Sequence, residues 1–138
     1  MVLITLIHNF IRLAADHESV NLDTWMASNT HVQHLYNKYG DGADVCVTEG
    51  VMGLFDGYQR MQGSSAEIAR LLNIPVVLIV SARSTAYSVA PLIYGFKHFN
   101  PAVKIAGIVF NQVSSPLISL IYVRLVLMQE WNVWDICL

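Results

Sequence analysis

Three apolar runs of strand length recur along the chain, and each of them ends in a polar residue or is followed by one. They occupy residues 43–48, 76–80 and 104–111. Segments with apolar residues at helical spacing separate these runs, so the predicted order is β-α-β-α-β. Such alternation is typical of a three-layer α/β fold, in which helices cover both faces of a parallel sheet and ligands bind beyond the carboxyl ends of the strands. We therefore expect Glu49, Ser81 and Asn111, which follow or close the runs, to share one edge of the sheet.

Helix boundaries are marked by capping residues. Ser28 and Asn29 can cap a helix that continues to Tyr39, because the Gly40-Asp41-Gly42 sequence supplies a left-handed turn that ends it. Ser64 and Glu67 have the spacing of a capping box and predict a second helix. A third helix is predicted within residues 87–99, starting or kinking near Pro91, with its aromatic residues packed in the core.

The segment 48–57 combines three glycines with two carboxylates immediately after the first predicted strand. Glycine allows close backbone approach, and a carboxylate at a strand end can hold Mg²⁺ through oxygen or water contacts. Glu49 is therefore the metal candidate, and Glu49 and Asp56 are the catalytic candidates. On spacing alone, a solvated turn closed by Asp56-Gly57 is an equally good interpretation.

A second polar segment, residues 81–85, follows the next strand and precedes a helix. Its hydroxyl groups and free amides could bind an anion, which makes Ser84 and Thr85 candidates for cofactor binding. The alternative is that Ser84 or Thr85 only caps the helix. Asn111 could present its amide to a nucleotide base, although an Asn at a strand end more often begins a turn.

Charge and cysteine content exclude several classes of function. A net charge of −2 leaves no basic stripe for nucleic acid. Cys46 and Cys137 suggest neither a disulfide framework nor a thiolate cluster, and no basic leader precedes the first apolar residues, so we expect a reducing cytoplasm. The apolar tract 117–128 is too short to span a bilayer. His31 and His34 lack further ligands for zinc.

Five segments, taken together, are specific enough to indicate a family. They are residues 19–26, 48–57, 63–72, 82–90 and 107–113. From about residue 13 to residue 116 the chain resembles the cobyrinic acid a,c-diamide synthase family. The resemblance implies a P-loop NTPase fold like that of dethiobiotin synthetase. It also implies that ATP with Mg²⁺ phosphorylates a corrinoid carboxylate and that ammonia from glutamine displaces the phosphate. Carried over by position, Glu49 lies near Mg²⁺ and the phosphates, Asp56 lies beside the reacting carboxylate, and Asn111 approaches the base.

The printed sequence departs from this family at two functional elements. It contains no G-x-x-x-x-G-K-[ST] phosphate loop, and no nucleophilic cysteine of a glutaminase domain is placed to act. We therefore expect a single partial synthetase domain, incomplete as a P-loop fold, that is inactive in isolation and relies on the glutaminase domain of an intact parent. The alternatives are a non-catalytic, self-associating α/β module, or a segment of a cobyric acid synthase, a dethiobiotin synthetase or a partitioning-type ATPase.

Both ends of the chain suggest a change of reading frame. Back-translating residues 1–13 one base out of register can give G-P-D-Y-L-D-T-Q-F-H-T-L, which resembles the substrate-side loop of the family. The same operation on residues 117–138 gives a string that resembles the continuation of the family sequence. We therefore predict that residues 1–12 and 117–138 are out-of-frame tails, whose apolar character favours homo-oligomers over a defined fold.

Overall fold

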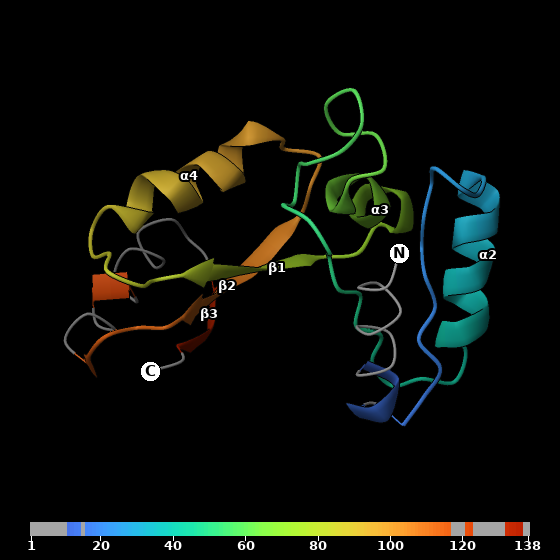
Figure 1. Cartoon of the computed structure of the whole chain (residues 1–138), viewed down its shortest axis with the longest axis horizontal. Helices are drawn as coiled ribbons and strands as arrows, with labels where there is room; N and C mark the ends of the chain where they lie inside the picture. The colour runs from blue at the N-terminus through green and yellow to red at the C-terminus, as the bar shows by residue number, and fades with distance from the viewer. Residues whose placement is uncertain (1–10, 15, 117–120, 123–131, 137–138) are drawn as a thin grey trace. The chain divides into compact units, whose positions relative to one another are not determined.

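A computed structural model describes residues 11–14, 16–116, 121–122 and 132–136. The chain divides into two compact units, Met1–Leu72 and Asn73–Leu138. The first contains α2 (Asn29–Gly40) and α3 (Ser65–Leu72), and the second contains β1 (Val76–Ser81), α4 (Val89–Phe99), β2 (Ile105–Asn111) and β3 (Asn132–Ile136) (Figure 1). The combination confirms an α/β fold.

Helix α2 begins where the capping residues predict. The Ser28 side chain accepts a hydrogen bond of 3.3 Å from the His31 amide, which satisfies one of the free amides of the first turn. The helix ends at Gly40, one residue beyond the prediction, and Gly42 supplies the left-handed conformation with φ of 78°. Gln33 ties α2 to α3 by donating a side-chain hydrogen bond of 3.2 Å to the Leu71 carbonyl.

Helix α3 confirms the predicted capping box with one variation. The Glu67 amide donates to the Ser64 hydroxyl at 3.2 Å, as the motif requires. The Glu67 carboxylate accepts from the Gly63 amide at 2.6 Å, one residue earlier than the usual partner, and also from the Thr24 hydroxyl at 2.9 Å. Glu67 therefore fixes the start of α3 and two segments that precede it.

The first predicted strand, residues 43–48, is not a strand. The segment is an irregular coil, and Val45 and Val47 are 77% and 89% exposed. The prediction is wrong because β-branched residues form a strand only where a neighbouring backbone can pair with them, and no such pairing involves this segment within the described part of the chain. The coil instead lies close to α2: burial raises the pKa of Tyr36, and the negative charge of the Cys46 thiolate raises it further.

The second and third predicted strands form a parallel pair with a helix between them. β1 and β2 are in register from Val77 opposite Gly107 to Ser81 opposite Asn111. α4 connects them and runs alongside the sheet (Figure 1). Pro91 lies in the first turn of α4, where its missing amide costs nothing, as predicted. The core of this unit consists of Leu78, Val80, Val89, Ile93, Ile108 and Phe110.

The position of β1 in the sheet corrects a second expectation. Among the described residues the strand order is β1-β2-β3, so β1 lies at the edge of this described sheet and β2 is central. Alternate residues of β1 face outward, and Ile79 is 73% exposed, whereas strands covered on both faces were expected. The aromatic residues Tyr87, Tyr94 and Phe99 are also exposed rather than buried in the core, because α4 turns Val89 and Ile93 inward instead. Tyr94 packs on His98, with 4.2 Å between ring centroids.

Parts of the predicted C-terminal tail belong to this unit. β3 pairs with β2 in parallel, from Gly107 opposite Asn132 to Phe110 opposite Ile136. Tyr122 is fully buried and its ring stacks on Phe110, with 4.6 Å between ring centroids. The change of reading frame stays a prediction, and residues 1–10 lie outside the described residues.

Candidate functional site

The glycine-rich coil of the first unit is held against the start of α3. The Leu54 carbonyl accepts a hydrogen bond of 2.9 Å from the Ala66 amide, one of the amides that a helix leaves free in its first turn. Gly50 lies so close to Ser65 that a Cβ atom would come within 2.6 Å of the Ser65 hydroxyl oxygen. A side chain at residue 50 would therefore force the Ser65 hydroxyl to rotate away, so glycine keeps this part of the coil close to the start of α3.

Asp56 closes a tight turn within the same coil. Its amide donates a hydrogen bond of 2.9 Å to the Gly53 carbonyl, and its carboxylate lies where a Cβ atom of residue 53 would stand. The Asp56 side chain is exposed at the surface. The turn therefore presents a carboxylate to solvent on a backbone that two hydrogen-bonded residues hold in place.

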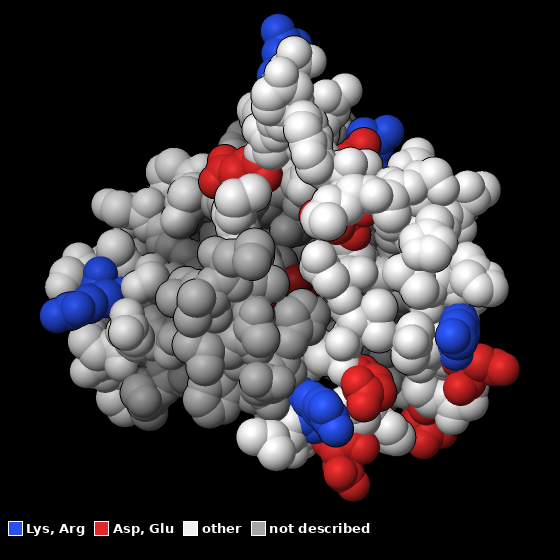
Figure 2. Space-filling model, turned by 45° about the vertical axis from the view of Figure 1, so that its right-hand side comes forward, with Lys and Arg blue, Asp and Glu red and all other residues white. Residues whose placement is uncertain are grey.

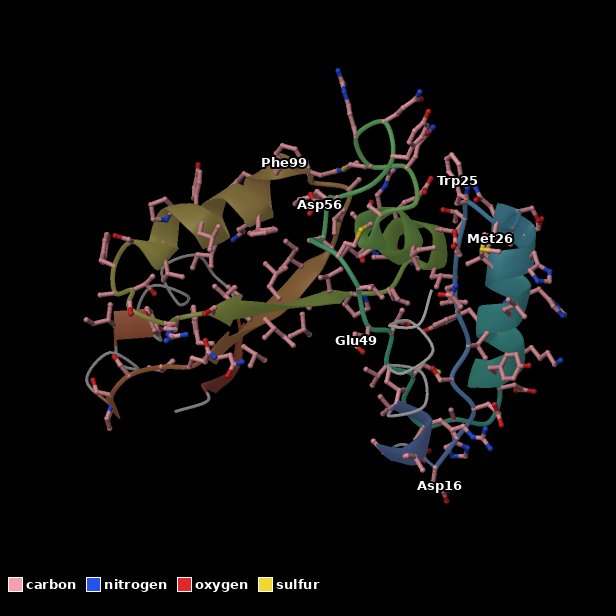
Figure 3. All side chains as sticks on the ribbon, viewed as in Figure 1. Asp16, Trp25, Met26, Glu49, Asp56 and Phe99 are labelled. Atoms are coloured by element: carbon pink, nitrogen blue, oxygen red, sulfur yellow. The ribbon has the colours of Figure 1, made fainter. Side chains whose placement is uncertain are left out.

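Glu49 does not join Asp56 in one cluster. It is exposed in the irregular coil that precedes Gly50, and Figure 3 shows the two carboxylates at separate points of that coil. The expectation that Glu49 follows a strand is wrong, because residues 43–48 form no strand. The catalytic roles of Glu49 and Asp56, and the metal role of Glu49, remain predictions.

The carboxyl edge of the β1–β2 pair brings the other candidates together. Ser81 lies opposite Asn111 in register, and the Ala82 amide donates to the Asn111 carbonyl at 2.8 Å. The Ser81 hydroxyl donates to the side-chain carbonyl of Gln112 at 3.2 Å. The prediction that Ser81 and Asn111 share an edge is confirmed.

Ser84 and Thr85 lie in the loop that follows β1, but they do not cap α4. That helix begins after Ser88, which makes no side-chain capping bond, so the capping interpretation of Ser84 or Thr85 is wrong. Ser84 is exposed with φ of 56°, a left-handed conformation that is uncommon for residues other than glycine and is concentrated at functional sites.

Tyr122 forms hydrogen bonds with Thr85 in this loop. This contact was not predicted from the sequence. The Tyr122 hydroxyl donates to the Thr85 carbonyl at 2.8 Å and lies 3.0 Å from the Thr85 hydroxyl. Since Tyr122 carries one proton, the Thr85 hydroxyl is the donor in the second bond. Ser84 is therefore the hydroxyl of this pair that faces solvent. The predicted tail around Tyr122 gave no periodic signal that could have revealed the contact.

Three similar proteins from different organisms are all named as a,c-diamide synthases. The chain is 41% identical over 108 residues to a cobyrinate a,c-diamide synthase of Dehalococcoides mccartyi, which covers 77% of this chain and 23% of the relative. It is 47% identical over 98 residues to a cobyrinate a,c-diamide synthase of Caldanaerobacter subterraneus, covering 70% and 22%. It is 42% identical over 106 residues to a hydrogenobyrinate a,c-diamide synthase of Brucella ovis, covering 76% and 24%. Over this segment, the chain is similar to proteins that are named a,c-diamide synthases of cobyrinate and hydrogenobyrinate. No family model and no solved structure matches it.

The chain spans about a quarter of the length of these diamide synthases. The coil with Glu49 and Asp56 and the edge with Asn111 both lie within residues 13–116, where the sequence resembles the diamide synthase family.

The donor set of this segment suits a magnesium ion that keeps most of its water and phosphate ligands. Within the described ranges, no group of three His, Cys, Asp or Glu side chains could hold a metal. Mg²⁺ is commonly bound by one or two carboxylates together with substrate phosphates, so a single exposed Glu49 fits that mode. A site enclosed by protein ligands does not fit.

Charges are mixed on the described part of the face in Figure 2, and the described helices are short. Figure 2 shows acidic and basic side chains dispersed among other residues on the face that it draws. No helix among the described residues is both long and apolar enough to cross a membrane.

Proposed function

We propose that this chain is a segment of an ATP-driven, glutamine-dependent ligase that converts two carboxylates of a corrinoid into amides. The observation that carries the proposal is the match, over about three quarters of the chain, to proteins named as a,c-diamide synthases of cobyrinate and hydrogenobyrinate. A product named as a diamide of an acid implies that two carboxylates each gain a nitrogen.

The chemistry requires activation because a carboxylate resists attack by ammonia. One carboxylate oxygen attacks the γ-phosphorus of ATP, ADP leaves, and an acyl phosphate forms. Ammonia then attacks the acyl carbon, the carbon–oxygen bond breaks, and phosphate leaves with the amide as the product. Most of the barrier comes from bringing anions together in line, so positioned donors and cations accelerate the first step.

Glu49 and Asp56 are the residues that we assign to this reaction. Glu49 would hold Mg²⁺, which supplies positive charge to the phosphate oxygens when bound. Asp56, fixed in its turn with Gly53, would orient the substrate side of the reaction. Support comes from the hydrogen bonds from the Asp56 amide to the Gly53 carbonyl and from the Ala66 amide to the Leu54 carbonyl, which hold the backbone that precedes Asp56.

The edge of β1 and β2 is the proposed nucleotide side. Ser84 and Thr85 would bind phosphate, with Ser84 the accessible hydroxyl, and Asn111 would approach the base. The parallel β1–α4–β2 arrangement supports a P-loop NTPase fold like that of dethiobiotin synthetase, because such sheets bind ligands beyond the carboxyl ends of their strands. The glutaminase domain of the intact parent would supply ammonia, and the cytoplasm is the compartment that we propose.

A chimera tests the function and the two carboxylates. Residues 13–116 would replace the matching segment of the Dehalococcoides mccartyi synthase, and amide formation from cobyrinate would be followed by mass spectrometry. We expect the chimera to be active, and Asp56→Asn to lower its kcat on the order of 10²-fold or more. Asp16→Asn, which changes an exposed carboxylate outside the coil, is the matched control. An active chimera that is indifferent to Asp56→Asn and Glu49→Gln contradicts the assignment.

The isolated chain is expected to bind nucleotide poorly. The phosphate loop of the family does not occur in the printed sequence, so we expect no affinity for Mg-ATP tighter than roughly millimolar, or about −4 kcal/mol. Isothermal titration calorimetry would measure this affinity, and micromolar affinity would overturn the expectation.

A second candidate function is a non-catalytic module that self-associates. The exposure of Ile79 favours this candidate, and analytical sedimentation measures self-association independently.

A further inference from the structure

An exposed aromatic pair lies on the first unit. Trp25 and Tyr58 are 69% and 55% exposed, yet their rings meet edge to face with 5.0 Å between centroids. The neighbouring Met26 is also exposed (Figure 3). Exposed apolar side chains are usually scattered singly, and adjoining ones mark binding surfaces more often. This contact between two exposed rings therefore marks a candidate binding surface.

The Trp25 backbone is held by a turn built on Asp23. The Asp23 carboxylate accepts hydrogen bonds from the amides of Trp25 at 2.7 Å and Met26 at 3.3 Å. The Ala27 amide donates to the Asp23 carbonyl at 3.1 Å, and the Thr24 hydroxyl donates to the Glu67 carboxylate at 2.9 Å. Trp25 is thus exposed at its ring but fixed at its backbone.

Tyr58 stands on a short hairpin that begins directly after Asp56. The amides of Tyr58 and Gln62 donate to each other's carbonyls at 2.8 Å and 3.1 Å. Gln59 and Arg60 form the tip with φ of 42° and 82°, a conformation that costs residues with a side chain roughly 1–2 kcal/mol each. Such strain persists only where surrounding contacts impose it.

One carboxylate joins the two segments that carry the aromatic residues. Glu67 accepts from Thr24, next to Trp25, and from Gly63, at the foot of the hairpin. Buried Ser64 anchors the same foot by donating to the Met61 carbonyl at 2.7 Å. The rings are consequently ordered before any ligand arrives, which lowers the entropy lost on binding.

We propose that Trp25, Tyr58 and Arg60 form the surface that binds the corrinoid substrate, a step that rests on the proposed function. The flat apolar ring of the corrinoid packs against the aromatic pair, and Arg60 at the hairpin tip pairs with one of its peripheral carboxylates. Charge complementarity favours this ligand, because the exposed cation Arg60 stands at the tip of the same hairpin that carries Tyr58, and this hairpin continues directly from Asp56. Glu67 is a positioning residue that acts through the segments it joins.

Titration of the whole chain with cobyrinate, without ATP, tests the surface. The ligand absorbs visible light, so binding can be followed by its spectrum and by fluorescence quenching. We expect Trp25→Ala and Tyr58→Ala each to weaken binding roughly tenfold, the effect expected for one aromatic contact. Tyr39→Ala, near the other end of α2 and 48% exposed, is the matched control and should bind normally.

Glu67→Gln separates positioning from contact. It keeps the size of the side chain but weakens the bonds to Thr24 and Gly63, so we expect weaker cobyrinate binding together with greater mobility of the Trp25 ring in fluorescence anisotropy. Far-UV circular dichroism checks that each variant folds. A loss of binding in Glu67→Gln without added mobility of Trp25 contradicts the positioning role.

Three results would contradict the proposal that this surface binds the corrinoid. They are a folded chain that does not bind cobyrinate, a Tyr58→Ala variant that binds it unchanged, and a Tyr58→Ala variant that only dissociates a dimer, which would make the surface a contact between copies. The proposed function fails differently: cobyrinate binds through Trp25 and Tyr58, while the chimera forms no amide.

Discussion

Residues 43–48 and the strand β1 have similar sequences and opposite structures. Both are short runs rich in valine that end in polar residues. β1 pairs with β2 and buries Leu78 and Val80, whereas Val45 and Val47 remain exposed in a coil. The difference shows that β-branched composition permits a strand, but that a pairing backbone and a covering helix are needed to form one.

The same difference divides the candidate site. Asn111 and Ser81 are positioned by strand register, which the sequence pattern could predict. Glu49 and Asp56 are positioned by a coil whose path depends on glycine contacts and on the first turn of α3. The position of a carboxylate on such a coil depends on α3, just as the position of a residue on a strand depends on the sheet.

The largest expected effect compares one buried and one exposed apolar residue. Phe110→Ala removes a fully buried ring that stacks on Tyr122, and should lower the free energy of unfolding by about 3–5 kcal/mol. Val47→Ala should change it by less than about 0.5 kcal/mol. Urea unfolding followed by circular dichroism measures both. Comparable losses of unfolding free energy in the two variants would mean that residues 43–48 are packed in solution. The contrast between this segment and β1 would then not hold.

Tyr122→Phe tests whether the predicted C-terminal tail contributes to the stability of the second unit. Loss of the hydroxyl leaves the Thr85 carbonyl without its 2.8 Å donor, at a cost of about 1–3 kcal/mol. Tyr58→Phe, which alters an exposed hydroxyl, is the control and should be neutral. Thermal unfolding would report the change. An unaltered melting temperature in Tyr122→Phe favours a tail that does not pack.

Ser64→Ala tests the order at the start of α3, on which the carboxylate coil depends. The variant removes the acceptor for the Glu67 amide and the donor to the Met61 carbonyl, and should cost about 1–2 kcal/mol. Ser88→Ala changes a capping residue without a side-chain bond and should cost less than about 0.5 kcal/mol. Equal losses in urea unfolding would show that the capping box adds nothing.

Arg60→Gly has the smallest expected effect on stability and the opposite sign. Glycine relieves the left-handed strain at φ of 82°, which should stabilise the first unit by up to about 1 kcal/mol. The same variant should bind cobyrinate more weakly, because it removes the proposed partner of a carboxylate. A variant that gains stability and keeps its affinity would leave the strain without a role in binding.

Local signals predicted the helices better than the sheet. Ser28 and Glu67 mark helix starts by bonds to residues three positions away, so a short stretch of sequence contains both partners. The edge position of β1 depends on pairings tens of residues apart, which periodicity does not encode. The Tyr122–Thr85 bonds and the Thr24–Glu67 bond join distant segments in the same way, and neither could be predicted.

The edge position of β1 has a consequence for reconstitution. Among the described residues, one side of this strand has no partner strand, so its backbone amides and carbonyls on that side can accept an added strand. A synthetic peptide supplied in trans could complement the sheet there, as a donor strand does. Chains that tolerate such complementation can be assembled from pieces made separately.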